Sequence, residues 1–190
     1  MNSVTNIPIN NKQYYITDRY NPLPENYIPP CLVRAPVPFF APYNSSKRYI
    51  ALPMYEPLRK LFYSCYKEGL HLMGISAFRS YKQQKEIYEN SIVKRGREYT
   101  NTHIAYPGTS EHQTGFAIDV SSPMLNYELE EEFENTSEGI WLKNNAHKYG
   151  FTFSFTKENQ EYTGYVNEPW HIRYDYKNAT FYPVINKNRC

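Results

Sequence analysis

Residues 110–120 have the sequence SEHQTGFAIDV, which contains the pattern of a β-strand. Apolar Phe116, Ile118 and Val120 alternate with small or polar residues, which is the period of a β-strand with one buried face. The alternation places Asp119 on the face opposite these three side chains. We therefore expect a strand here whose aspartate can point into a functional site.

The residues on either side of this strand supply metal-binding groups. Gly115 permits a tight turn between His112 and the strand. Farther along the chain, EPWH (residues 168–171) adds His171 and a glutamate three residues before it, and Pro169 restricts the backbone between the two. Catalytic zinc sites keep three protein ligands and leave a fourth position to water, and a nearby glutamate can act as general base. Two imidazoles, a carboxylate and a spare glutamate therefore predict a zinc-dependent hydrolase.

The prediction depends on the combination of these residues. A single histidine is usually structural or exposed to solvent, and we interpret His71, His103 and His147 in that way, although the loop of His103 lies just before the motif. A strand aspartate alone would also be weak evidence. For Glu168, the alternative interpretation is a salt bridge.

The segments around the motif predict an α+β fold. The expected elements of the first half are a helix over 54–68, a strand over 70–77, a helix that begins after Ser80 and runs to about Lys94, and a loop over 95–109. The strand at 116–120 is followed by a helix over 137–149 and by two strands within 162–176. Because helices come early and strands late, we expect a small antiparallel sheet flanked by helices.

Residues 1–48 differ from the rest of the chain in composition. They are rich in proline, asparagine and tyrosine, which makes regular secondary structure unexpected there. Their aromatic content favours an arm packed on the domain over a disordered tail. We therefore divide the chain into an N-terminal arm, residues 1–48, and a domain that carries the predicted zinc hydrolase site, residues 49–190.

Composition and cysteine usage narrow the class of protein. The net charge is +2, and no run of lysine or arginine is present, which argues against a nucleic-acid partner. Cys31, Cys65 and Cys190 form no CxxC motif, so we interpret them as buried or incidental thiols. No apolar run reaches the length of a membrane span, and the amino terminus has no export signal. A cytoplasmic protein, a trimmed ectodomain and a phage-encoded protein all fit, and we expect a monomer.

Three motifs together resemble a known family. Residues 110–119 match its SxHxxGxAxD pattern, and residues 168–171 match its ExxH pattern. SAFRSYKQQ, residues 76–84, is similar to its SxYRSYxxQ segment, with Phe78 in place of the usual tyrosine. Over roughly residues 50–175, the chain resembles the VanY-type D-alanyl-D-alanine carboxypeptidases. These are zinc peptidases related to the VanX-like dipeptidases and to L,D-carboxypeptidases.

The resemblance implies roles for eight residues. They are His112, Asp119 and His171 as zinc ligands, Glu168 as catalytic base, Arg79 facing the scissile carbonyl, Gln84 and Ser110 as substrate contacts, and Trp170 packed beneath the site or binding substrate.

The resemblance also implies a substrate. We expect removal of the C-terminal D-Ala from peptidoglycan stem peptides or muropeptides at the bacterial cell wall, with the D-Ala-D-Ala pentapeptide ahead of the L,D-linked tetrapeptide. Phe155 stands where relatives usually offer a tyrosine hydroxyl, which predicts broader specificity. The alternatives with the same zinc site are a peptidoglycan endopeptidase (a lysin) and an L,D-carboxypeptidase. The alternative from another class is a non-catalytic wall-binding module, which the complete ligand set with Glu168 disfavours.

Overall fold

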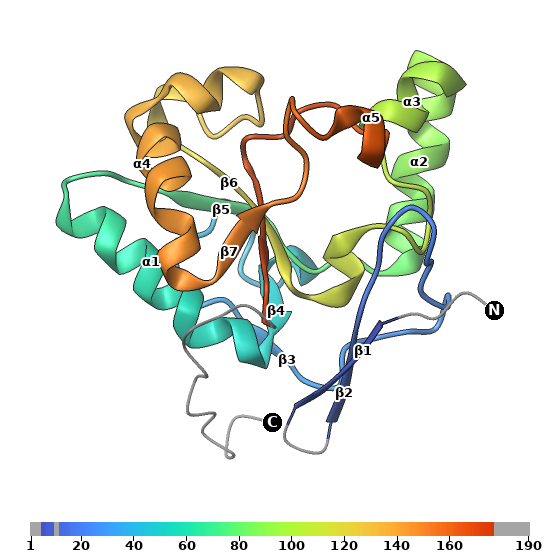
Figure 1. Cartoon of the computed structure of the whole chain (residues 1–190), viewed down its shortest axis with the longest axis horizontal. Coiled ribbons are helices and arrows are strands. Elements are labelled where there is room, and N and C mark those ends of the chain that lie inside the picture. Colours follow the sequence, from blue (N-terminus) through green and yellow to red (C-terminus); the bar gives the residue numbers. More distant parts are fainter. Residues whose placement is uncertain (1–4, 10–11, 177–190) are drawn as a thin grey trace.

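The computed structural model describes residues 5–9 and 12–176. Its centre is an antiparallel sheet of four strands in the order β5-β6-β8-β7. The strands are β5 (Met73–Ser76), β6 (Ala117–Ser121), β7 (Phe151–Phe153) and β8 (His171–Tyr174). Figure 1 shows α1 and α4 on one side of this sheet and α2 and α3 on the other. The expected α+β fold, a small antiparallel sheet flanked by helices, is confirmed.

Five α-helices and six short 3-10 helices occur among the described residues. The α-helices are α1 (Tyr55–Lys67), α2 (Tyr81–Arg95), α3 (Arg97–His103), α4 (Ser137–Asn145) and α5 (Gln160–Thr163). The 3-10 helices are η1 (Ser46–Arg48), η2 (Leu52–Met54), η3 (Glu111–Thr114), η4 (Pro123–Leu125), η5 (Glu131–Asn135) and η6 (Ala146–Tyr149). In the described part of the chain, no helix has both the length and the hydrophobicity that crossing a membrane requires.

The first two predicted helices are confirmed, and the sequence explains their limits. In α1, Leu58, Leu61, Phe62 and Cys65 are buried at the spacing of one helix face, and they join the core beneath the sheet. In α2, a capping box at Ser80 fixes the first turn, because its hydroxyl accepts the N–H of residue 83 and the side chain there accepts the N–H of Ser80.

Two local predictions are wrong. The expected loop over 95–109 contains α3, which begins after Gly96 at a φ of 85° and is supported by a hydrogen bond of 2.8 Å from the Thr100 hydroxyl to the Gly96 carbonyl. The segment 162–176 contains only one strand, β8. Upstream of β8, the backbone N–H of Val166 donates to the carbonyl of Thr102 in α3 and not to a neighbouring strand.

The expectation that residues 1–48 lack regular structure is also wrong. Strands β1 (Thr5–Ile9) and β2 (Lys12–Ile16) form an antiparallel hairpin, and β3 (Leu32–Arg34) pairs with β4 (Tyr49–Ala51). In β2, the side chain of Tyr14 is only 2% exposed, and its ring centroid lies 5.4 Å from that of Phe116. The hairpin therefore meets the core at the start of β6. The domain boundary at residue 48 stays a prediction.

The cysteines divide into two kinds. Cys65 is a free thiol buried in the core side of α1, as expected, and burial raises its pKa to about 12. Cys31 is disulfide-bonded, so the interpretation of an incidental thiol is wrong there. Spacing along the chain cannot show which distant residues approach it. Cys190 lies outside the described residues.

Candidate active site

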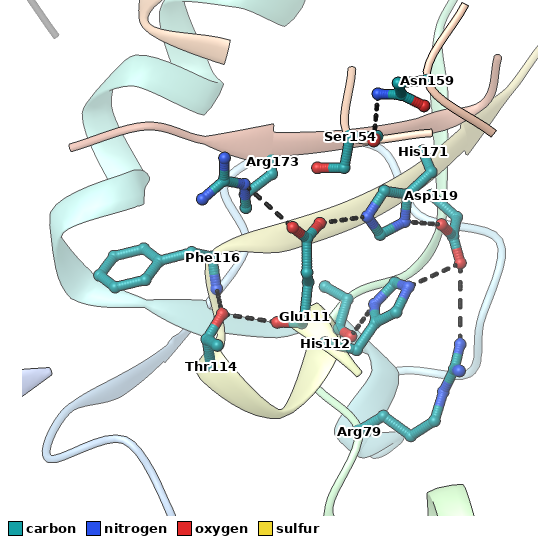
Figure 2. A network of polar contacts seen from close by, with 11 residues as sticks. Arg79, Glu111, His112, Thr114, Phe116, Asp119, Ser154, Asn159, His171 and Arg173 are labelled. Carbon is teal, nitrogen blue, oxygen red and sulfur yellow. Dashed lines mark hydrogen bonds and ion pairs between the residues drawn. The ribbon is translucent and has the colours of Figure 1, made fainter. Parts of the chain in front are cut away.

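Strand register brings two of the three predicted ligands together. Asp119 on β6 and His171 on β8 are directly opposite each other, and His171 Nδ1 lies 2.9 Å from Asp119 Oδ1. His112 comes from η3, and its Nε2 lies 3.2 Å from Asp119 Oδ2 (Figure 2). All three residues are buried, and one ligand atom from each lies within 4.8 Å of the other two.

The outer ring nitrogens show which atoms face the metal position. His112 Nδ1 donates to the backbone carbonyl of Ala77 at 2.7 Å, which leaves its Nε2 lone pair toward Asp119. His171 turns its Nε2 to Glu111 Oε2 at 2.8 Å, which leaves Nδ1 on the metal side. Two imidazoles with occupied outer nitrogens and one carboxylate are a donor set that fits zinc. These residues form a buried metal site.

The charges of this cluster depend on one another. Burial alone would raise the pKa of Asp119, but the charges and hydrogen bonds of His112 and His171 hold it well below its usual range. For His171, burial opposes the charge, yet the carboxylates of Asp119 and Glu111 raise its pKa to about 10. The two carboxylates and the imidazole of His171 thus stabilise one another's charges.

Glu168 and Arg79 lie in the same cavity as the three ligands. The cavity has a volume of about 180 Å³. Burial raises the pKa of Glu168 to about 7, so its carboxylate can both take and release a proton near neutral pH. Arg79 Nη2 lies 3.7 Å from Asp119 Oδ2. The cluster therefore combines metal ligands, a candidate base and a cation.

The predicted substrate contacts also line the cavity. Ser110 is buried just before η3, and Trp170 is half-buried just before β8. Both ends of the Gln84 amide are bound by the protein: Oε1 accepts from Arg79 Nη1 at 2.8 Å, and Nε2 donates to the carbonyl of Ala105 at 2.7 Å. Gln84 therefore holds Arg79 in place, and its substrate contact stays a prediction, as do those of Ser110 and Trp170.

Several residues of the site were not predicted. His103, Glu111, Leu129 and Tyr165 line the cavity as well. Glu111 had one available signal, since it is a carboxylate adjacent to His112 in sequence. Phe155 stood out as a departure from the family pattern, and its ring centroid lies 5.1 Å from that of His171.

Comparisons with known proteins agree with this geometry. The VanY family model, described as D-alanyl-D-alanine carboxypeptidase, matches residues 47–177. YodJ of Bacillus subtilis is 41% identical over 178 residues, which are 94% of this chain and 62% of YodJ. The chain thus spans about six-tenths of the length of that relative.

Two solved structures are similar. LdcB, described as an LD-carboxypeptidase, has a TM-score of 0.80 and 36% identity over 90% of this chain and 84% of that chain. A mutant of the vancomycin resistance D,D-pentapeptidase VanY, solved in complex with Zn(II), has a TM-score of 0.66 and 26% identity over 84% of this chain and 85% of that chain. The match of sequence, fold and buried ligand set establishes that the chain belongs to the VanY family.

Proposed function

We propose that the protein is a zinc carboxypeptidase that removes the C-terminal D-amino acid from peptidoglycan stem peptides. The observation that carries the proposal is the buried cluster of His112, Asp119 and His171, which shares one cavity with Glu168. The family membership supports the substrate class. The proposed site of action is the bacterial cell wall.

Glu168 is the proposed general base. When bound by the three ligands, zinc supplies Lewis acidity and lowers the pKa of a water molecule to roughly 7. The Glu168 carboxylate takes a proton from the attacking water and returns it to the nitrogen of the leaving amine. Burial raises the pKa of Glu168, which favours uptake of the proton by its carboxylate.

Arg79 is the proposed partner of the negative charge that develops on the scissile carbonyl oxygen. Its guanidinium is held by Gln84 at 2.8 Å, and Gln84 is in turn fixed to Ala105. A donor that is fixed before the reaction stabilises the transition state without reorganisation, and loss of one such donor typically costs about a hundred- to a thousandfold in rate.

The order of substrates is the finer part of the proposal. We place the D-Ala-D-Ala pentapeptide ahead of the L,D-linked tetrapeptide, in line with the description of the family model. The similarity to LdcB favours the L,D-carboxypeptidase as the second candidate. Phe155 lines the cavity without a hydroxyl to offer, so discrimination between the two peptides is expected to be modest.

Mass spectrometry of digested muropeptides tests the proposal. The zinc-loaded protein should release one terminal D-Ala from pentapeptide muropeptides faster than from tetrapeptide muropeptides at equal enzyme concentration. Activity on the tetrapeptide alone would reverse the substrate order and support the L,D candidate. Cleavage only at internal bonds would contradict the carboxypeptidase reading in favour of the endopeptidase.

A further inference from the structure

His171 lies between two carboxylates, only one of which is a metal ligand. Its Nδ1 is 2.9 Å from Asp119 Oδ1, and its Nε2 is 2.8 Å from Glu111 Oε2. Figure 2 shows the imidazole held between these two groups. We propose that Glu111 is the positioning residue of the metal site: it binds the Nε2–H of His171 and so keeps the Nδ1 lone pair turned toward the metal.

The need for Glu111 follows from the position of Asp119. A neutral imidazole carries one proton, and Asp119 Oδ1 is an acceptor placed to attract that proton to Nδ1. A proton on Nδ1 would block the ligating lone pair. Glu111 offers a competing charged acceptor at the other nitrogen, and hydrogen bonds to charged groups are roughly twice as strong as neutral ones. The carboxylate thereby selects the tautomer that can bind a metal.

The two histidines differ in the acceptor that fixes the ring. The Nδ1 of His112 donates to the neutral carbonyl of Ala77, so this ring would bind the metal through Nε2. The Nε2 of His171 lies against the charged carboxylate of Glu111, so this ring would bind the metal through Nδ1. A charged acceptor also makes the imidazole a more basic ligand. Glu111 therefore adds to the metal affinity as well as to the orientation of the ring.

Glu111 is itself held by its second oxygen. Arg173 Nε lies 3.1 Å from Glu111 Oε1. Arg173 follows His171 by two residues on β8, so both side chains are on the same face of the sheet. Both members of the pair are largely shielded, with side chains 23% and 10% exposed for Arg173 and Glu111. One alternative remains open to test: the Arg173–Glu111 ion pair could hold the fold without acting on the metal.

Metal affinity, measured without substrate, separates these two roles. Metal affinity depends on the metal site and not on the proposed peptidase activity. A result that contradicts the role of Glu111 can therefore be told apart from a result that contradicts the peptidase function. Zinc competition with a chromogenic chelator and the absorption spectrum of the Co²⁺-substituted protein should be recorded for four variants. They are Glu111→Met, which removes the acceptor, Glu111→Gln, which leaves a neutral acceptor, Arg173→Gln, which breaks the ion pair, and Glu89→Gln, a control on the exposed side of α2.

The proposal predicts a graded result. Zinc affinity should fall by roughly 10–100-fold in Glu111→Met and by less in Glu111→Gln, with an altered Co²⁺ spectrum in the former. Arg173→Gln keeps the acceptor of His171 and should lose less affinity than Glu111→Met. Glu89→Gln should match the parent protein. On a peptide substrate, the Glu111 variants should show a lower kcat with KM little changed.

Two results would overturn the proposal. One is a Glu111→Gln or Glu111→Met protein with the zinc affinity and Co²⁺ spectrum of Glu89→Gln. The other is an Arg173→Gln protein that loses as much affinity as Glu111→Met, because Glu111 would then act only through the ion pair. If Glu111→Met does not fold, the comparison of Glu111→Gln with Glu89→Gln decides, since the glutamine is nearly isosteric with the glutamate.

Discussion

At the scale of single residues, Glu168 lines the same cavity as the metal site without belonging to the cluster of His112, Asp119 and His171. Glu168 is held in a turn in which its backbone N–H donates to the Phe155 carbonyl at 3.0 Å and its own carbonyl accepts from the His171 N–H at 3.1 Å. Its place in the chain is thus tied to a ligand, while its carboxylate stays outside the ligand cluster. Binding of the metal and turnover of the peptide should therefore be separable by mutation.

The substitution Glu168→Ala tests that separation. The variant should bind one zinc per chain with near-parental affinity and lose turnover by roughly 10²–10⁴-fold, which is the usual contribution of a general base. Zinc stoichiometry by atomic absorption and release of D-Ala should be measured on the same preparation. Loss of zinc in proportion to activity would make Glu168 a ligand, and normal hydrolysis would place the base elsewhere.

The ligands were predictable at this scale, and the residues that orient them were not. His112, Asp119, Glu168 and His171 are named by short motifs with characteristic spacing. The pairing of Glu111 with His171 joins residues 60 positions apart, through a hydrogen bond between η3 and β8. No local sequence pattern predicts which carboxylate will form a hydrogen bond with which imidazole.

At the scale of elements, the first turn of α2 links stability to the site. Arg79 immediately precedes the helix cap at Ser80, and Gln84 lies on the first turn and fixes Arg79. The capping box therefore fixes the start of the helix directly beside Arg79, the proposed partner of the charge on the scissile carbonyl oxygen. A weaker cap should therefore affect both the stability of α2 and the position of Arg79.

The substitution Ser80→Ala should lower the free energy of unfolding by about 1 kcal/mol, the usual cost of removing such a cap. It should also lower kcat, because the Arg79 backbone loses its fixed neighbour. Ser64→Ala within α1 is a matched control and should leave stability unchanged or slightly raised, because alanine is the better helix former. Urea unfolding and peptide turnover check both variants. Equal stability of Ser80→Ala and Ser64→Ala would contradict the prediction.

Elements with a strong pattern were predicted, and those that depend on contacts were not. The apolar face of α1 and the alternation of β6 are visible in the sequence. By contrast, α3 contains few apolar residues and is stabilised by packing on α2, and hairpin β1–β2 lies in a proline-rich region. Local propensity in such segments is weaker than the packing and pairing that the folded molecule provides.

At the scale of the whole molecule, the metal site joins two strands and a 3-10 helix across the sheet. Because the unfolded chain does not hold the three ligands together, bound zinc should stabilise the fold by mass action. At a free zinc concentration of 100 times Kd, this amounts to about 2.7 kcal/mol, or a rise in Tm of roughly 5–10 °C for a chain of this size. Thermal unfolding with zinc and with a chelator should show the difference. In the His112→Ala variant, zinc should raise the Tm little or not at all. A full rise in Tm in that variant would refute His112 as a metal ligand.

The contact between the arm and the core predicts a response to alkaline pH. Burial raises the pKa of Tyr14 to about 12, whereas an unfolded tyrosine titrates near 10. Because the pKa of Tyr14 is higher in the folded state, its contribution to the free energy of unfolding is fully present below pH 10 and is lost as the pH rises toward 12. The free energy of unfolding should therefore decline over this window, and less steeply in Tyr14→Phe. Urea unfolding at pH 8, 10 and 11 measures both slopes, and identical slopes would exclude Tyr14 as a cause.

The strand order β5-β6-β8-β7 has a consequence for biosynthesis. The strand that carries His171 is inserted between two strands that precede it in the chain, so the central position of the sheet is filled last. A ribosome-bound nascent chain in which residue 171 is still in the exit tunnel already displays His112 and Asp119, yet it cannot complete the coordination sphere. Pairing over such sequence distances has high contact order and is slow. Metal uptake should therefore report the final step of maturation, after the helices have formed.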